Sequence, residues 1–320
     1  MAVDWQVRLR RGRFVVLGRV GMDLYADPPG QRIQDARGYV AAIGGSAGNI
    51  AVALARQGVA AALLTAVSDD AVGAYCRAEL ARYGVDIRHV FMRGGRTSLA
   101  VAETRADAQV VLYRQGAADF GLTATDVAGL DFAPVGGLIV TGTALAAEPS
   151  RGAARAAMVA ARAAGAVVVL DIDHRAYSWA SDAEAAAEYG RAADAADVVI
   201  GNDAEFALLG GIGAARDLGK RCFAVYKKGG LGSVTFAGDL AIETAIYPVQ
   251  AQKPMGAGDG FMGGLMAGLA QGFDLEAALR RGAATAAMIV AGVGCAPASP
   301  SGHELDAFMA ERAGDAHSAV

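Results

Sequence analysis

Short runs of consecutive apolar residues alternate with longer segments of helical spacing over most of the chain. Continuous apolar runs are typical of strands that are buried on both faces of a parallel sheet. The alternation predicts strands at 14–18, 61–67, 137–141, 166–173, 198–201, 222–227 and 233–237. It predicts helices at 49–58, 70–83, 150–164, 182–195, 203–209, 259–271, 275–293 and 304–310. The sequence therefore predicts an α/β fold whose mainly parallel sheet is covered by helices on both faces.

Two strand-like runs, at 98–104 and 110–114, interrupt this alternation. A short polar link joins them, which favours an antiparallel hairpin. We expect the hairpin region 94–115 and the extended pieces at 20–43 to form a small separate sheet, inserted as a lid in one domain that spans residues 1–320. The last residues, 311–320, are expected to form a flexible tail.

A loop of small residues, Gly256-Ala257-Gly258, runs directly into the helix predicted from Asp259. Such a loop presents unpaired N–H groups and the positive end of the helix dipole, which together bind anions. A carboxylate at this place repels a bound phosphate, so a purely structural role does not explain it. As a general base, however, it takes the proton of an attacking hydroxyl while the amides hold the phosphoryl group. The alternative is that Asp259 only caps the helix. The loop alone leaves both open.

Further polar residues follow the predicted strands at their carboxyl ends, where parallel sheets place their functional side chains. They are the run 171–175, the pair Asn202 and Glu205, and the run 227–232. For Glu205 the alternative is an ordinary first-turn acid that favours its helix dipole. The four histidines show no metal-ligand spacing, and we assign them no catalytic role.

Composition narrows the class of protein. A chain of 320 residues with 54% hydrophobic and 19% charged residues is typical of a compact enzyme. No apolar run approaches the ~18 residues of a membrane span, and the N-terminus does not resemble a signal peptide. A net charge of −4 offers no basic surface for nucleic acid. The three cysteines lack disulfide or zinc spacing, so we expect packing residues in a cytoplasmic protein.

Two segments in order identify a family. The run 44–55, Gly-Gly-Ser-Ala-Gly-Asn-Ile-Ala-Val-Ala-Leu-Ala, and the run 256–264, Gly-Ala-Gly-Asp-Gly-Phe-Met-Gly-Gly, resemble the two signatures of the phosphofructokinase-B (ribokinase-like) carbohydrate kinases. The run 294–297 resembles the loop beside the adenine in that family. Two signatures in the right order are far more specific than either alone. The resemblance covers nearly the full chain and implies a ribokinase-like three-layer α/β/α fold. It also implies ATP-dependent, magnesium-requiring phosphorylation of a small sugar or sugar acid.

The resemblance also implies roles for individual residues. Asp259 would be the general base, and the amides of Gly256, Ala257 and Gly258 would form the anion hole. The residues expected to bind the acceptor are Asp23, Gly44, Gly45, Asn49, Arg114 and Arg175. Those expected at the nucleotide are Asn202, Glu205, Lys227, Gly229, Gly232 and Cys295, with Glu205 also reaching magnesium through water. The alternatives are a turn residue at Asp23, a helix cap at Asn49, and ordinary surface ion pairs at Arg114 and Arg175.

Three departures from the family pattern refine this picture. Lys227 stands where many members have threonine, and Asp173 replaces the Asn of an Asp-x-Asn-x-Arg run found in keto-sugar-acid kinases. Lys253 replaces an Asp that helps potassium-activated members bind a monovalent cation. Our hypothesis is that the ammonium of Lys253 supplies that charge instead.

A further resemblance narrows the choice of acceptor. The runs 253–259, 18–30 and 113–119 resemble 5-dehydro-2-deoxygluconokinases of inositol catabolism. This implies 5-dehydro-2-deoxygluconate as acceptor. The alternatives are 2-keto-3-deoxygluconate, fructose, inositol or a nucleoside, or a non-catalytic sugar or nucleotide sensor on the same fold. Exposed apolar positions on the hairpin, if present, would favour a homodimer formed through the lid.

Overall fold

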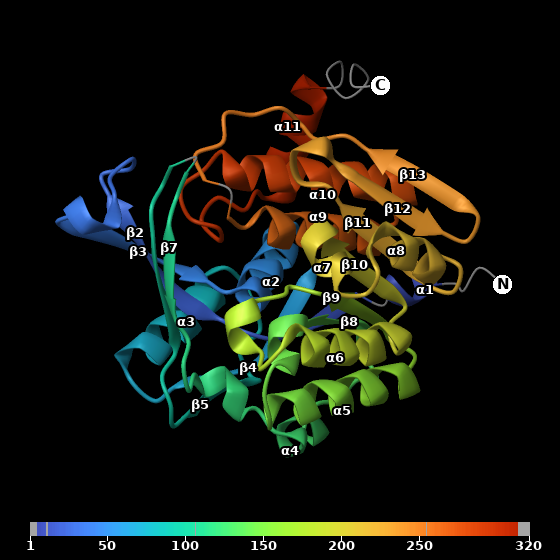
Figure 1. Cartoon of the computed structure of the whole chain (residues 1–320), viewed down its shortest axis with the longest axis horizontal. Coiled ribbons are helices and arrows are strands. Elements are labelled where there is room, and N and C mark those ends of the chain that lie inside the picture. Colours follow the sequence, from blue (N-terminus) through green and yellow to red (C-terminus); the bar gives the residue numbers. More distant parts are fainter. Residues whose placement is uncertain (1–4, 11, 106, 254, 313–320) are drawn as a thin grey trace.

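One large sheet forms the centre of the computed structural model, which describes residues 5–10, 12–105, 107–253 and 255–312. The strand order is β13-β12-β11-β10-β9-β8-β1-β4-β5 (Figure 1). All neighbouring strands from β11 to β5 pair in parallel, which confirms the predicted mainly parallel sheet. The strands are β1 (Arg13–Leu17), β4 (Ala60–Ser68), β5 (Val90–Arg93), β8 (Val135–Thr141), β9 (Val167–Asp171), β10 (Val198–Asn202), β11 (Phe223–Lys227), β12 (Ser233–Ala237) and β13 (Leu240–Thr244).

Helices cover both faces of this sheet, and the side chains of β1 show the division. Phe14 and Val16 enter one apolar core, whereas Val15 and Leu17 enter the other. The first core is covered by α1 (Trp5–Leu9), α2 (Ser46–Arg56), α3 (Ala71–Arg82), α9 (Ala257–Gln271), α10 (Leu275–Val290) and α11 (Gly302–Glu311). The second is covered by α4 (Ala124–Ala128), α5 (Ser150–Ala163), α6 (Asp182–Asp194), α7 (Asp203–Ala207) and α8 (Gly211–Gly219). Within the described ranges, no helix is long and apolar enough to cross a membrane.

The far edge of the sheet differs from the prediction. The strand predicted at 233–237 forms, but it pairs antiparallel with β11, because the link 228–232 is too short for a crossover between parallel strands. The next turn adds β13, also antiparallel. Strand β13 was not predicted, because most of its residues are exposed and it lacks a continuous apolar run. The short strand β5 and the glycine-rich helix α8 were missed as well.

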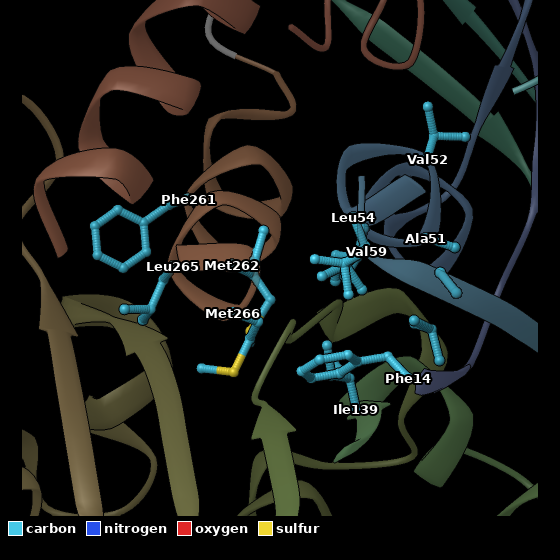
Figure 2. Close-up of a cluster of buried hydrophobic side chains, with 14 of the residues drawn as sticks. Phe14, Ala51, Val52, Leu54, Val59, Ile139, Phe261, Met262, Leu265 and Met266 are labelled. Atoms are coloured by element: carbon cyan, nitrogen blue, oxygen red, sulfur yellow. The ribbon is translucent and has the colours of Figure 1, made fainter. Parts of the chain in front are cut away.

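Helix α9 lies in the first core between the sheet and its neighbouring helices. Figure 2 shows Met262 and Met266 of α9 in one apolar cluster with Phe14 of β1 and with side chains of α2. These residues are fully buried, as are Leu265 and Leu269 of the same helix. A helix that is apolar on nearly every side is held by packing all round. The amino end of α9 is therefore fixed at the edge of the sheet where the parallel strands end.

A second sheet, with the strand order β3-β2-β6-β7, projects from the main body (Figure 1). It consists of β2 (Gly21–Asp27), β3 (Gly38–Gly44), β6 (Ser98–Ala102) and β7 (Val110–Tyr113). Strands β6 and β7 pair antiparallel, as the hairpin pattern predicts, and β2 pairs in parallel with β6. That this sheet acts as a lid stays a prediction. Of the predicted tail 311–320, residues 313–320 lie outside the described residues, and Glu311 is the last residue of α11.

Candidate active site

The loop Gly256-Ala257-Gly258 forms the amino end of α9. Gly256 is the residue before the helix and adopts the left-handed conformation, with φ 83°. A Cβ at this position would lie 2.6 Å from the Cys295 sulfur, so both the conformation and the space require glycine. The helix begins at Ala257, two residues before the predicted start. Its first N–H groups have no partner within the helix and are free to bind an anion.

Asp259 lies in the first turn of α9, but within the described residues its carboxylate accepts no hydrogen bond from a backbone N–H of that helix. Its Oδ2 instead accepts a hydrogen bond of 2.8 Å from the Asn49 side chain on α2. Burial raises the pKa of Asp259 to about 6, and the charge of Asp173 adds to this shift. The Asn49 bond, Arg175 and Lys227 lower that pKa. The capping alternative is therefore wrong, whereas the role of Asp259 as general base stays a prediction.

Carboxylates and cations gather beside this loop at the carboxyl ends of β9 and β11. The Lys227 Nζ lies 3.8 Å from Oδ1 of Asp171, a side chain only 5% exposed. Burial raises the pKa of Asp171 well above its ordinary value, although Lys227 opposes the shift. Burial works to lower the pKa of Lys227, but Asp171, Glu205, Asp259 and Asp173 together raise it, so this ammonium stays charged. Sequence reasoning placed Asp171 at a strand end without giving it a role.

Asp173 joins this group from the chain just after β9. Its Oδ2 accepts hydrogen bonds from the Ser46 hydroxyl at 2.5 Å and the Thr143 hydroxyl at 3.2 Å. Its Oδ1 lies 2.7 Å from the Arg175 guanidinium, whose side chain is 38% exposed. Asp173 adopts φ 37°, a left-handed conformation that Asp and Asn tolerate better than most residues. Arg175 is thus paired with an internal carboxylate while part of it still reaches solvent.

Asn202 and Glu205 form a reciprocal cap at the start of α7. The Asn202 side chain accepts from the Glu205 N–H at 2.9 Å, and Glu205 Oε2 accepts from the Asn202 N–H at 2.7 Å. Glu205 Oε1 also accepts from the N–H of His174 at 3.2 Å. Glu205 is thus an acid in the first turn of α7, as the alternative from the sequence describes, and it also caps that helix. Its magnesium role stays a prediction.

The donor set suits a hydrated magnesium ion better than a dehydrated one. Over the described ranges, no group of three His, Cys, Asp or Glu side chains lies close enough to hold a metal ion directly. Magnesium usually keeps several waters and binds one or two carboxylates together with substrate phosphates. Asp171 and Glu205 are buried carboxylates whose charges act on Lys227, and two such groups fit that mode of binding.

A cavity of about 460 Å³ opens beside the anion loop. The predicted nucleotide residues Asn202, Lys227, Gly229 and Gly232 line it. The rest of its lining is largely apolar and comes mainly from residues after β13, from α9 and from α10: Ile246, Tyr247, Val249, Phe261, Ala283, Ala286, Ala287 and Val290. Such a mixture of an apolar end and a polar end suits a flat aromatic base with attached phosphates. Cys295 is not part of this lining.

Four of the expected acceptor residues lie together near Asp259. Asp23 on β2 accepts a hydrogen bond of 3.1 Å from Tyr25, and burial raises its pKa while Arg19 opposes the shift. On β3, Ala42 lies opposite Asp23 and Gly44 lies two residues further along, where a Cβ would be 2.1 Å from the Asp23 carboxylate. Gly45 then begins α2, the helix that brings Asn49 to Asp259. The pairing of β2 with β3 therefore holds Asp23 beside Gly44, just before the amino end of α2.

Arg114 lies apart from these four. Its guanidinium is buried, pairs with Asp119 at 2.6 Å, donates to the Thr143 carbonyl at 3.1 Å and lies over the Phe120 ring. It lines a second cavity, of about 1060 Å³, with Tyr113 and Tyr177. The surface ion pair considered from the sequence is therefore wrong, since the pair is internal. Contact between Arg114 and an acceptor stays a prediction.

Lys253 lies directly behind the anion loop with its side chain fully buried. Its Nζ donates to the carbonyl of Met255 at 2.9 Å and to the carbonyl of Ile289 at 3.2 Å. The same nitrogen lies 3.7 Å from the Cys295 sulfur, which in turn lies 3.6 Å from the Tyr25 hydroxyl. Backbone carbonyls are the ligands that a bound alkali cation would use. Sequence reasoning marked Lys253 by its departure from a motif but missed Tyr25 and Cys295 as its neighbours.

Comparison with known proteins shows what this chain is similar to. Residues 12–302 match the family described as pfkB family carbohydrate kinase. A 5-dehydro-2-deoxygluconokinase from Photobacterium profundum is 37% identical over 94% of this chain and 96% of its own length. A PfkB protein from Polaromonas sp. JS666 has a TM-score of 0.80 at 28% identity, covering 92% of this chain and 99% of that one. A fructokinase variant from Vibrio cholerae O395, with fructose, ADP and a potassium ion bound, has a TM-score of 0.83 at 26% identity, covering 93% and 98%.

The raised pKa of Asp259 predicts that Asp259→Asn stabilises the protein. The folded pKa of about 6 lies above the ordinary value of 3.8. The carboxyl group therefore favours folding below pH 3.8, and this contribution is lost as the pH rises through 6. At pH 8 the variant should gain on the order of 3 kcal/mol in unfolding free energy, and at pH 5 distinctly less. Denaturant unfolding at both pH values measures this.

Asp239→Asn, a change at an exposed aspartate between β12 and β13, is the matched control and should not alter stability at either pH. An Asp259→Asn variant that is less stable than the parent at pH 8 would contradict the burial argument.

Proposed function

The chain belongs to the pfkB family of carbohydrate kinases, and we propose that it transfers the γ-phosphoryl group of ATP to a primary hydroxyl of 5-dehydro-2-deoxygluconate. The name of the Photobacterium relative supports the acceptor. The observation that carries the reaction type is the position of Asp259: a half-buried carboxylate of raised pKa beside the free N–H groups of Gly256-Ala257-Gly258. That arrangement combines a proton acceptor with an anion hole in one turn of helix.

In the proposed mechanism, ATP occupies the 460 Å³ cavity with its base at the apolar end and its phosphates toward Lys227 and Gly258. Asp259 takes the proton of the acceptor hydroxyl as its oxygen attacks the γ-phosphorus, and the bond from that phosphorus to the bridging oxygen breaks to release ADP. The amides of the anion loop hold the charge on the transferring group. Asp171 and Glu205 would hold magnesium through water, and the ion would neutralise charge on the phosphates.

The acceptor residues fit a sugar acid. Asp23, Gly44 and Asn49 supply hydrogen-bonding groups for sugar hydroxyls next to Asp259. A substrate carboxylate needs a cation, and a partly exposed guanidinium can form paired hydrogen bonds to it. Arg175 is the better placed of the two arginines, since part of its side chain is exposed whereas Arg114 is enclosed by Asp119 and Phe120.

Other acceptors remain alternatives within the family, and a non-catalytic sensor is the alternative from another class. A screen for ADP release with 5-dehydro-2-deoxygluconate, 2-keto-3-deoxygluconate, fructose, inositol and nucleosides separates them. We expect the highest kcat/KM with 5-dehydro-2-deoxygluconate. Higher kcat/KM with another compound would overturn the acceptor, and sugar binding by calorimetry without any ADP release would favour a sensor.

The same assay tests the base. Asp259→Asn removes the proton acceptor but keeps a side chain that Asn49 can hydrogen-bond. We expect a fall in turnover on the order of 10³-fold, within the range for acid–base groups, while ATP binding measured by calorimetry is retained. Turnover close to that of the parent would remove Asp259 from the role of base.

The buried ammonium of Lys253 predicts independence from potassium. Its Nζ already occupies the carbonyl-lined position behind the loop, so an added cation has no site there. Replacing sodium with potassium in the assay should leave turnover unchanged. Lys253→Met should lower turnover, whereas Lys220→Met, at an exposed lysine on the surface, should not. A several-fold rise of parent turnover in potassium would contradict this role.

We also propose a homodimer formed through the second sheet. Strand pairing places Tyr39, Val111 and Tyr113 on the face opposite Asp23 and Tyr25, and these three apolar side chains are exposed. Leu24, Ala41 and Val101 lie on the same face. An exposed apolar sheet face of this kind is typical of an interface.

Sedimentation of the parent should give twice the chain mass of 32.4 kDa. Tyr113→Glu should shift the sedimenting mass to that of a single chain, because dimer formation would bury the new charge. Val159→Glu, at an exposed apolar residue on α5, is the control and should remain dimeric. A parent protein that sediments as a single chain would exclude the dimer.

A cytoplasmic location also stays a proposal, and the state of the thiols supports it. Cys76, Cys222 and Cys295 are free. Burial raises the pKa of each thiol, to about 12 for Cys76 and about 11 for the other two. The thiols are thus protonated at neutral pH and unreactive, as expected of packing residues.

A further inference from the structure

Lys227 carries a largely enclosed positive charge whose N–H donors are not all paired with protein groups. Its side chain is 16% exposed, and its Nζ is 3.8 Å from the Asp171 carboxylate, beyond hydrogen-bond distance. No hydrogen bond from this Nζ is found to any described residue. An ammonium group has three N–H donors. The pair with Asp171 is therefore loose, and the donors remain available to a ligand that enters the cavity.

The ammonium lies against the anion loop. A Cβ built on Gly258 would lie 3.1 Å from the Lys227 Nζ, so this nitrogen sits over the second residue of α9. Lys227 ends β11, where its backbone pairs with Asn202 on one side and Ser233 on the other. The side chain thus starts from a rigid strand end and brings its charge to the amides that flank Asp259.

The charges around Lys227 also favour contact between its ammonium and a phosphate. The carboxylates of Asp171, Asp173, Glu205 and Asp259 all act on Lys227. A nucleotide phosphate that approaches the anion loop enters this negative field, so it requires a cation at the point of contact. Lys227 lines the cavity there, whereas Arg175 is already held by Asp173 at 2.7 Å.

We propose that Lys227 is a catalytic residue of the phosphoryl transfer, whose ammonium leaves Asp171 and contacts the transferring phosphoryl group and the bridging oxygen when ATP fills the cavity. The inference rests on the proposed function and extends it, because Lys227 then acts on the reacting atoms rather than only lining the nucleotide site. Negative charge moves to the bridging oxygen as its bond to the γ-phosphorus breaks. An ammonium at that oxygen stabilises this charge more in the transition state than in bound ATP, and so raises kcat. Asp171, which loses its partner, is then free to face the magnesium waters.

The test compares Lys227→Met and Lys227→Gln, which remove the charge and keep most of the length, with Lys228→Met. Lys228 is the neighbouring residue, pairs with Glu243 at 2.7 Å and does not line the cavity. We expect kcat to fall on the order of 10²-fold in both Lys227 variants, as for the loss of one positioned donor, with the acceptor KM little changed. Calorimetry should show weaker binding of a non-hydrolysable ATP analogue, unchanged binding of AMP, and parent behaviour for Lys228→Met.

A kcat within about threefold of the parent in both variants would overturn the proposal, since one lost donor costs far more than that. Equal losses of affinity for AMP and for the ATP analogue would overturn it too, because they indicate a collapsed cavity rather than a lost phosphate contact. Thermal unfolding confirms that each variant is folded. The nucleotide measurements need no acceptor. If the parent phosphorylates no sugar, the proposed function fails, while the comparison of AMP with the ATP analogue still tests Lys227.

Discussion

The interaction on which the site depends is the partial burial of the Asp259 carboxylate at the positive end of α9. A desolvated carboxylate is costly unless neighbouring groups offset the cost. Asn49 supplies a hydrogen bond from α2, and Lys227 and Arg175 supply positive charge from the sheet edge. Three separate parts of the chain therefore have to meet at one carboxylate. Their positions follow from the packing of α2 and α9 in the same core.

This requirement explains why the site lies where the parallel strands end. Strands β9, β10 and β11 run side by side in parallel. Their last residues, Asp171, Asn202 and Lys227, therefore lie along the same edge of the sheet. The second sheet approaches the same edge from its own strands and brings Asp23. Parallel pairing thus converts residues that are distant in sequence into neighbours. The polar groups then satisfy one another, as in the contacts of Asp173 with Ser46 and Thr143.

Most of the main sheet and the anion loop were predictable from the sequence, because continuous apolar runs and the run 256–264 are local signals. The antiparallel direction of β12 was missed because the strand itself carries no mark of it, although the short link 228–232 already excludes a parallel crossover. The burial of Arg114 was also beyond local pattern, because its partners Thr143 and Ser178 come from distant segments. Tyr25 gave no signal at all, although it touches both Asp23 and Cys295. Contacts of this kind are set by tertiary packing alone.

The lysine behind the anion loop has a consequence for how the charge there is maintained. A dissociable ion occupies its site only in proportion to its concentration in the surroundings, and its departure empties the site. The Lys253 ammonium is attached to the chain two residues from the Met255 carbonyl it contacts, so its local concentration is set by the covalent structure. The unfavourable free energy of desolvating that ammonium is part of the free energy of folding. The positive charge behind the anion loop is thus part of the polypeptide itself. Its presence does not vary with dilution or with the ionic composition of the solution.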